Sequence, residues 1–565
     1  MKPSTLQTAS FDHTKYRPSP VINKPNRQWP SKTINHAPLW CAVDLRDGNQ
    51  ALIEPMNVAQ KQKMWALLIK LGFKHIEIGF PSASQPDFDF CRWLIEEDQI
   101  PHDVTIQALT QARDPLIERT YEALVGAKQA IIHVYNSTSP VQRNKVFHLD
   151  KDGIIEIARH GAQKVLEEST KYPDTAWSFE YSPESFSSTE IDFSIDVCNA
   201  VIDIWQPSPT NKVIINLPAT VECSTPNVFA DQVETFCENV HQRESVIVSL
   251  HTHNDRGCGV AAAELGVLAG ADRIEGTLMG NGERTGNMDI ITMAMNLYSQ
   301  GIDPQLDLSN ADEITNTVSE CTQISTHPRH PWLGELVYTA FSGSHQDAIR
   351  KCLAQQEPDQ PWDVAYLPIN PADIGRDYQS VIRVNSQSGK GGVAYILESH
   401  YDLSLPRWLQ IEASRAVQAY SESESTEVTP EKIWDIVNNT FFAQQGEQQL
   451  QDYRLERQKN TESIHVTLVE KDAITNISGE GDGALSAFCK ALEQHFHCHI
   501  EITHYDQHAI ESGSDASAVA YVQAKINGQR YNGISKDNDT ISANLNAILT
   551  CLNQSIAYNE QTLAS

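Results

Sequence analysis

Hydrophobic and polar residues follow a repeating order along the first half of the chain. Between about residues 37 and 300, short apolar or β-branched runs recur roughly every 30 residues, and a helix-like stretch follows each run. The runs expected to form strands are 40–44, 74–79, 104–109, 130–135, 176–181, 212–217, 246–251 and 273–278. Eight alternating strand and helix units of this length predict an α/β fold, a (β/α)8 TIM barrel.

An open, doubly wound sheet is the alternative arrangement for alternating strands and helices. It needs a glycine-rich phosphate-binding turn early in the chain, and none follows the first predicted strand. The late sequence SGKGGVAY, with Gly389, Gly391 and Gly392, is a single weak match that is more typical of a turn. The barrel is therefore favoured.

The remaining regions differ from the barrel in pattern. Residues 1–36 are polar and rich in proline, which indicates an extended arm packed on another part of the protein. The barrel is expected over 37–325, and a helical linker region over 326–445, with a helix that begins near Pro430. Residues 446–565 show a strand, a glycine-rich turn and a helix, then further strands and a helix. This region predicts a small α+β domain for ligand sensing or dimerisation.

Composition and charge limit the possible partners. Hydrophobic residues make up 40% of the chain and charged residues 21%, which excludes disorder as the main state. The formal net charge of −30 disfavours nucleic acid and anionic membranes as partners. The eleven cysteines contain no CxxC pair, no apolar run approaches the length of a membrane span, and the N-terminus lacks a signal-peptide core. We therefore expect a cytoplasmic protein.

Residues with reactive side chains cluster where the predicted strands end. The active site of a TIM barrel lies at the C-terminal ends of its strands. The residues that fall there are Arg46, Asp47, His133, Tyr135, Glu184, Thr220, His251, His253, Asn281, Glu283, Arg284 and Asn287. A random scatter would place some of them on helices, so this face of the barrel is the predicted site.

His251 and His253, which end the seventh strand, form the strongest local signal. Alternate residues of a strand point the same way, so both imidazoles can reach one ion. Asp47 supplies a carboxylate oxygen and Asn287 a carbonyl oxygen, a set that suits Zn²⁺, Mn²⁺, Co²⁺ or Mg²⁺. Buried, hydrogen-bonded histidines are the alternative for an isolated HxH pair. Metal-dependent amidohydrolases carry HxH on the first strand, which disfavours that class.

Longer motifs reveal a family resemblance. The segments DLRDGNQ, HTHNDRGCGVAAAELGVLAGADRIEGTLMGNGERTGN and RHPWLGELVYTAFSGSHQDAI resemble the acyl-CoA-dependent Claisen-condensing enzymes, and more narrowly the 2-isopropylmalate synthases of the long type. The likeness extends to VIRVNSQSGKGG and the C-terminal GSDASAVAY. It implies an acyltransferase that condenses acetyl-CoA with 3-methyl-2-oxobutanoate and water to give (2S)-2-isopropylmalate and CoA. This is the first committed step of leucine biosynthesis.

The resemblance also implies roles for individual residues. One divalent ion, Mg²⁺, Mn²⁺ or Zn²⁺, would have as its ligands Asp47, His251, His253 and Asn287. The implied catalytic residues are Arg46, Glu184, His345 and Tyr378. The implied 2-oxo-acid-binding residues are His133 and Thr220. His345 and Tyr378 lie outside the barrel, and the family pattern brings them over the partner's barrel in a swapped homodimer.

These roles form a consistent reaction. A metal that holds the carboxylate and keto oxygens of the 2-oxo acid makes C2 more electrophilic. His345 is the implied base for the methyl proton of acetyl-CoA. Arg46 and the metal stabilise the alkoxide before water cleaves the thioester. Some of these residues also have a purely structural interpretation. For Arg46 it is an ion pair with Asp47, and for Tyr378 it is packing of the linker. A Glu283–Arg284 pair that closes its loop is the third such case.

The C-terminal domain resembles the leucine-sensing domain of the family. Its Gly481–Gly483 turn and the GSDASAVAY segment carry this likeness, which implies leucine as a feedback inhibitor. Ala518 and Tyr521 are the expected regulatory contacts.

Other functions stay open at this point. Condensation with 2-oxoglutarate would give homocitrate, and condensation with pyruvate would give citramalate. The related 3-hydroxy-3-methylglutaryl-CoA lyase would need a cysteine in the loop after the eighth strand, where GNGERTGN has none, and Cys258 in another loop is expected to pack. A metal-binding sensor without turnover is the non-enzymatic alternative, and the presence of Arg46, Glu184 and His345 beside the ligand set argues against it.

Overall fold

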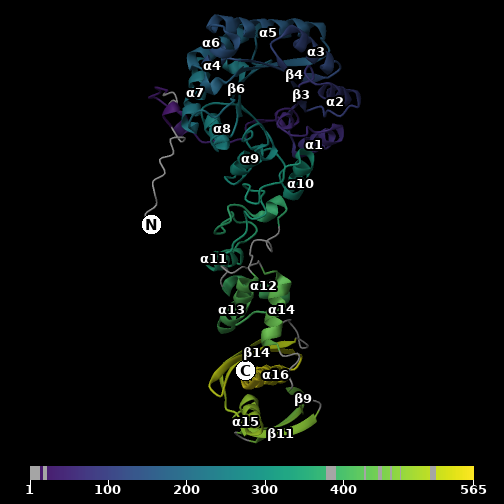
Figure 1. The fold of residues 1–565 in the computed structure, drawn as a ribbon, viewed down its shortest axis with the longest axis vertical. Helices are drawn as coiled ribbons and strands as arrows, with labels where there is room; N and C mark the ends of the chain where they lie inside the picture. Colours follow the sequence, from purple (N-terminus) through teal and green to yellow (C-terminus); the bar gives the residue numbers. More distant parts are fainter. Residues whose placement is uncertain are drawn as a thin grey trace. The chain divides into compact units, whose positions relative to one another are not determined.

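The computed structural model describes residues 13–16, 22–376, 390–424, 428–442, 448–458, 461–470, 473–509 and 517–564 (Figure 1). They form two compact units, Met1–Val337 with Asp373–Gly375, and Tyr338–Ala372 with Arg376–Ser565. Within the described part of the chain, no helix is both long and apolar enough to cross a membrane.

The first unit contains a closed barrel of eight parallel strands in sequence order. The strands are β1 Leu39–Ala42, β2 His75–Gly79, β3 Thr105–Gln111, β4 Gln129–Ser137, β5 Ala176–Glu184, β6 Val213–Ala219, β7 Val246–Thr252 and β8 Arg273–Gly276. The barrel closes where β1 pairs with β8, from Leu39 opposite Arg273 to Ala42 opposite Gly276. All eight predicted strands are present, so the predicted fold class is confirmed.

Helices surround the barrel and alternate with its strands (Figure 1). They are α1 Val58–Leu71, α2 Gln85–Glu96, α3 Asp114–Leu124, α4 Pro140–Gln142, α5 Lys151–Lys171, α6 Ile191–Trp205, α7 Pro226–Asn239, α8 Gly259–Leu268, α9 Ile290–Tyr298 and α10 Ala311–Thr322. Side chains satisfy several of the free helix ends, as in the capping box of Asn57 and Gln60 on α1. The strands, covered by helices outside, are almost fully buried.

The segment before β1 packs on α7 of its own barrel. Arg27 makes two hydrogen bonds of 2.7 Å to the carboxylate of Asp231, and the Trp29 indole donates to the same carboxylate at 2.9 Å. The backbone N–H of Trp29 donates to Glu234 at 2.8 Å. Polar side chains on one face of α7 therefore hold this part of the arm.

The second unit begins with helices α11 Gly343–Leu353, α12 Lys390–Tyr401, α13 Arg407–Glu424 and α14 Pro430–Phe441. The helix predicted near Pro430 is confirmed, and the Thr429 hydroxyl caps it by accepting from the N–H of Lys432 at 3.3 Å. Apolar side chains of α12, α13 and α14 form one buried cluster with Val519, Tyr521 and Ile534.

Two copies of a βββα arrangement make up the C-terminal part of this unit. The first copy is β9 Gln448–Gln458, β10 Thr461–Glu470, β11 Ala473–Gly481 and α15 Ala484–Phe496. The second is β12 Ile500–Ala509, β13 Ala518–Ile526, β14 Gln529–Asp537 and α16 Thr540–Ala564. The expectation of a single strand before α15 is wrong, because β9 precedes that strand and the NISGEG segment is itself β11. The expected turn is confined to the bend at Asp482 and Gly483.

Glycine in the third strand of each copy has a packing role rather than a turn role. A Cβ on Gly479 of β11 would lie 2.4 Å from the carbonyl oxygen of Ala487 on α15. A Cβ on Gly533 of β14 would lie 2.1 Å from the carbonyl oxygen of Ala547 on α16. In both copies the missing side chain lets the helix backbone approach the sheet.

A buried carboxyl group joins the two strands at the barrel seam. Asp44, just after β1, accepts a hydrogen bond from the N–H of Leu278, just after β8, at 2.9 Å. Its Oδ2 atom is buried and has no hydrogen-bond partner among the described residues. Burial raises the pKa of Asp44 from 3.8 to about 7, the Leu278 N–H opposes this, and Asp289 adds to it.

This pKa predicts how Asp44→Asn changes the pH dependence of stability. The folded-state pKa lies above the unfolded value, so the stabilising contribution of Asp44 is complete below about pH 4 and is lost as the pH rises through about 7. Asparagine does not ionise. As the pH rises from 4 to 8, the free energy of unfolding of the variant should therefore increase relative to that of the parent by at most about 4 kcal/mol.

Urea unfolding of parent and variant across this pH range measures the difference. Asp89→Asn, which removes an exposed carboxylate on α2, serves as the control. A difference between Asp44→Asn and parent that does not change with pH would contradict the assignment.

Candidate active site and metal centre

A cavity of about 180 Å³ opens among the C-terminal ends of the barrel strands. The residues predicted at strand ends that line it are Arg46, Asp47, His133, Tyr135, Glu184, Thr220, His251, His253, Glu283 and Arg284. The lining residues that were not predicted are Gln50, Leu109, Ser182, Asn216 and Pro218. Asn281 and Asn287 are not among the lining residues. The structure therefore brings together most of the predicted strand-end set.

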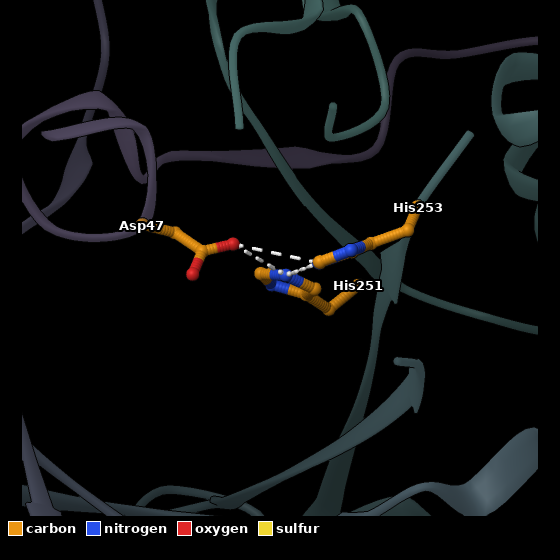
Figure 2. A group of neighbouring side chains, drawn as sticks. All are labelled: Asp47, His251 and His253. Carbon is orange, nitrogen blue, oxygen red and sulfur yellow. Dashed lines mark hydrogen bonds and ion pairs between the residues drawn. The ribbon is translucent and has the colours of Figure 1, made fainter. Parts of the chain in front are cut away.

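Three buried side chains converge in this cavity (Figure 2). Asp47 comes from the turn after β1, and His251 and His253 come from the end of β7. The Nε2 atom of His251 lies 3.2 Å from Oδ2 of Asp47 and 3.1 Å from Nε2 of His253, which is 3.5 Å from the same carboxylate oxygen. Three donor atoms this close together can share one divalent ion.

Asn287 has the properties of a fourth ligand. Its backbone pairs with that of His253, and its side chain is 2% exposed. The amide nitrogen donates to the carbonyl of Asn281 at 3.1 Å, whereas Oδ1 is buried with no hydrogen-bond partner in the described part of the chain. Two imidazole nitrogens, a carboxylate oxygen and a free amide oxygen fit a divalent metal.

The electrostatic environment separates the two histidines. Burial alone would raise the pKa of Asp47, but Arg46 and both imidazoles lower it well below its ordinary value. Burial lowers the pKa of His251, yet Asp47 and Glu275 outweigh it and raise that pKa to about 9. Burial, with the nearby charges of His251 and Arg284, lowers the pKa of His253. The same surroundings therefore shift the pKa values of the two imidazoles in opposite directions.

Arg46 bridges two carboxylates at the edge of the cavity. Its Nη1 donates to Asp47 Oδ1 at 2.5 Å, and its Nε donates to Glu77 on β2. The ion pair with Asp47 is thus present, and the guanidinium also lines the cavity. The two carboxylates hold this cation in one orientation.

His133 lies deeper in the barrel than expected. It was placed at the end of the fourth strand, but β4 continues to Ser137 and His133 is in its interior. One ring nitrogen lies 2.7 Å from Glu77, and the other lies 2.7 Å from the hydroxyl of Ser182. The ring is therefore held between β2 and β5 at the cavity wall.

Glu184 and Thr220 lie at the strand ends where they were predicted. Glu184 ends β5 and accepts from the hydroxyl of Ser137, and Thr220 follows β6 with its Oγ1 accepting from the N–H of Ser185 at 2.9 Å. Their side chains line the cavity.

Arg284 connects the loops that follow β7 and β8. Its Nε donates to Asp255 at 2.7 Å, whereas Glu283 lies 3.7 Å away. The Nη2 atom lies 2.5 Å from Nδ1 of His253. The main ion-pair partner of Arg284 is thus Asp255, and the Glu283–Arg284 contact is the weaker one.

A buried charged network beneath the triad was missed by the sequence analysis. Its members, all inside the barrel, are Glu77, Gln107, Glu180, Asn216, Ser249, Arg273 and Glu275. Charged residues within otherwise apolar strands, as in KHIEIG and RIEG, were the available signal. These charges lie in strand interiors and not at the strand ends where a barrel site is expected.

The remaining predicted residues lie elsewhere. His345 is in the first turn of α11, exposed, with its ring stacked on Tyr366 at a centroid distance of 4.0 Å. Tyr378 and most of the VIRVNSQSGKGG motif lie outside the described residues. Ala518 and Tyr521 on β13 are buried, Ala518 in the core of the C-terminal domain and Tyr521 in the cluster formed with α12, α13 and α14. Cys258 is half-buried before α8.

Three family models match successive parts of the chain. Residues 37–318 match the HMGL-like model, and residues 335–398 match the alpha-isopropylmalate synthase post-catalytic domain-like model. Residues 427–556 match the LeuA allosteric (dimerisation) domain. The order of these regions agrees with a barrel followed by a linker and a regulatory domain.

Two relatives that match nearly the whole chain carry the same name. A 2-isopropylmalate synthase of Pseudomonas fluorescens is 53% identical over 555 residues, covering 98% of this chain and 99% of the relative. One from Alcanivorax borkumensis is 53% identical over 557 residues, covering 98% of this chain and all of the relative. Both likenesses extend from the barrel through the regulatory domain, which confirms the resemblance drawn from the motifs. The chain therefore belongs to the 2-isopropylmalate synthase family.

Proposed function

We propose that this protein condenses acetyl-CoA with 3-methyl-2-oxobutanoate and water to give (2S)-2-isopropylmalate and CoA, and that this reaction opens leucine biosynthesis. The observation that carries the proposal is the Asp47, His251 and His253 triad within a cavity, in a chain more than half identical to enzymes of that name. The domain boundaries at 36, 325 and 445 and the cytoplasmic location stay predictions.

The metal identity is part of the proposal. Asp47, His251, His253 and Asn287 would hold one Mg²⁺, Mn²⁺ or Zn²⁺ ion, which when bound would polarise the keto group of the 2-oxo acid and orient its carboxylate.

Side chains of the cavity wall support a branched 2-oxo acid as the acceptor. Leu109 and Pro218 offer apolar surface for an isopropyl group, and His133 and Thr220 offer polar contacts for the 2-oxo acid. The permanent cations among the described lining residues are Arg46 and Arg284, and both already pair with carboxylates. A second carboxylate, as in 2-oxoglutarate, would find no unpaired cation in this lining.

Arg46 is suited to stabilise the oxygen that gains negative charge as the carbon–carbon bond forms. The guanidinium faces the cavity and is held by Asp47 and Glu77, so little reorganisation is needed at that moment. Glu184, at the opposite wall, would orient a reacting group through its carboxylate.

The base for the methyl proton of acetyl-CoA is proposed to come from another subunit. His345 is exposed on α11, so its ring is accessible to a substrate, and Tyr378 is proposed to act beside it. The match to a dimerisation domain supports a homodimer, in which each barrel would receive these residues from its partner.

Leucine is the proposed inhibitor. The allosteric-domain match over 427–556 supports a regulatory ligand for the C-terminal domain, with Ala518 and Tyr521 as proposed contacts. Because both side chains are buried, leucine would act there by changing how β13 packs.

The central prediction concerns acceptor choice and metal dependence. Release of free thiol from acetyl-CoA should be fastest with 3-methyl-2-oxobutanoate, slower with 2-oxoglutarate or pyruvate, and absent without acceptor. Chelation should abolish the release and a divalent ion should restore it. Asp47→Asn should lower it by at least about 100-fold, since even outer partners of a metal are worth about 10–100-fold.

Asp89→Asn on α2 is the matched control and should retain the parent rate. Preference for 2-oxoglutarate or pyruvate would identify a homocitrate or citramalate synthase instead. Absence of release with every acceptor would contradict the condensing activity.

Mixed dimers test whether His345 acts on the partner's barrel. His345→Ala and Asp47→Asn should each be nearly inactive alone. Equal mixtures that exchange subunits should recover about one quarter of the parent rate, because half of the dimers are hybrids and each hybrid has one intact site. Recovery is measured by thiol release after co-refolding or co-expression. If mixtures stay as inactive as the separate variants, His345 acts within its own chain or not at all.

Leucine should slow thiol release by the full-length protein, whereas D-leucine should leave the rate unchanged. Coupling between separate sites typically corresponds to about 5–150-fold in affinity. Leucine should also raise the melting temperature, because a ligand that binds only the folded state stabilises it. If leucine changes neither the rate of thiol release nor the melting temperature, the regulatory assignment is wrong.

A further inference from the structure

Glu275 on β8 connects the barrel interior to the metal triad. Its Oε2 atom accepts from Nδ1 of His251 at 2.8 Å and from the side-chain amide of Asn216 at 3.1 Å. Its Oε1 atom accepts from Arg273 at 2.9 Å and from Gln107 at 3.1 Å. Glu275 is 1% exposed, so its carboxylate is shielded from bulk solvent.

This contact determines which nitrogen of His251 faces the triad. Nδ1 points at the Glu275 carboxylate and Nε2 lies 3.2 Å from Asp47 and 3.1 Å from His253. In a neutral imidazole one nitrogen carries the hydrogen and the other holds a free lone pair. A hydrogen on Nδ1, directed at Glu275, leaves the Nε2 lone pair directed at the triad.

We propose that Glu275 is the positioning residue of the metal centre, which fixes the ring orientation and tautomer of His251 so that Nε2 is presented to a divalent ion. This inference rests on the metal site proposed above. Glu275 itself does not lie at the proposed ion position, because its carboxylate contacts Nδ1 of His251, on the opposite side of the ring from Nε2.

The surroundings of Glu275 require a carboxylate. All four of its partners are donors in this arrangement, and only an acceptor with two oxygens satisfies two donors on each side. Glutamine has nearly the same shape, but its NH₂ group would face two of these donors and leave them without an acceptor.

Arg273 keeps the Glu275 carboxylate in place. The guanidinium also donates to Ser249 at 2.8 Å and to His75 at 3.1 Å, and its own side chain is fully buried. Ser249 on β7 and His75 on β2 therefore hold Arg273 in place, Arg273 holds the Glu275 carboxylate, and this carboxylate orients the ring of His251.

Metal affinity, rather than activity alone, tests this role. Full-length parent and variants are stripped with a chelator and titrated with Co²⁺ in competition with a chromophoric chelator. Glu275→Gln should weaken Co²⁺ binding about 10–100-fold, the usual effect of losing an outer-shell partner. Its Co²⁺ absorption spectrum should also change.

Asp272→Asn is the control. Asp272 is next to β8 but is bonded to Val248 and Arg243 at the other end of the strand, so this variant should bind Co²⁺ within about twofold of the parent.

Glu275→Asp keeps the negative charge beside Arg273 but withdraws the carboxylate from His251 by one methylene group. This variant therefore tests the positioning role if Glu275→Gln does not fold. It should also weaken Co²⁺ binding, with a melting temperature of the metal-free protein closer to that of the parent. In a His251→Ala background, Glu275→Gln should cause no further loss of affinity, because its effect passes through that ring.

Three outcomes overturn the inference in distinguishable ways. If the parent binds Co²⁺ and both Glu275 variants bind it within about twofold of the parent, Glu275 has no positioning role although the metal site stands. If the parent itself binds no divalent ion, the proposed metal site fails and the role of Glu275 fails with it. An additional loss in the His251→Ala background would also contradict action through His251.

Discussion

Balanced charge inside the barrel is the constraint on which the site depends. Arg273 is fully buried, and burial alone would lower its pKa, but Glu180 and Glu275 keep it far above neutrality. Burial raises the pKa of Glu180 well above its ordinary value, whereas the neighbouring arginines hold the pKa values of Glu77 and Glu275 below theirs. A buried charge without a partner is strongly destabilising, so these groups fix one another's positions. The triad stands directly on this network through the His251–Glu275 contact.

Much of the fold was predictable because the barrel repeats one physical requirement eight times. Each strand is covered by helices, so apolar runs recur at a regular spacing and mark β1 to β8. The C-terminal domain was harder to predict. The sequence of β9 is mostly polar, so it does not resemble a buried strand. The glycines that let α15 pack closely against β11 cannot be distinguished in the sequence from glycines that form turns. Composition does not distinguish these two uses of glycine.

The candidate site divides in a similar way. Asp47, His251 and His253 were predictable because strand periodicity and barrel topology both direct them to one face. Asn287 joined them through its family motif, and its free Oδ1 atom supports the same role. Glu275 and Arg273 were not predicted, because a charged residue in the middle of a strand becomes interpretable only when its partners on other strands are known. His133 was predicted at the end of the fourth strand, but it lies in the strand interior. The length of β4 is set by its pairing with β5, which continues to Glu184, and not by the apolar run of β4 itself.

Anomalous diffraction from crystals of the protein loaded with Zn²⁺ would locate the metal relative to the triad. We expect one strong peak about 2.0–2.2 Å from the carboxylate of Asp47 and from the Nε2 atoms of His251 and His253, with Asn287 beside it. The second buried group that could geometrically hold an ion, formed by Glu77, His133 and Glu275, should remain free of metal because Arg46 and Arg273 neutralise its carboxylates. A peak in that second group, or no peak at the triad, would show that the triad is not the metal site.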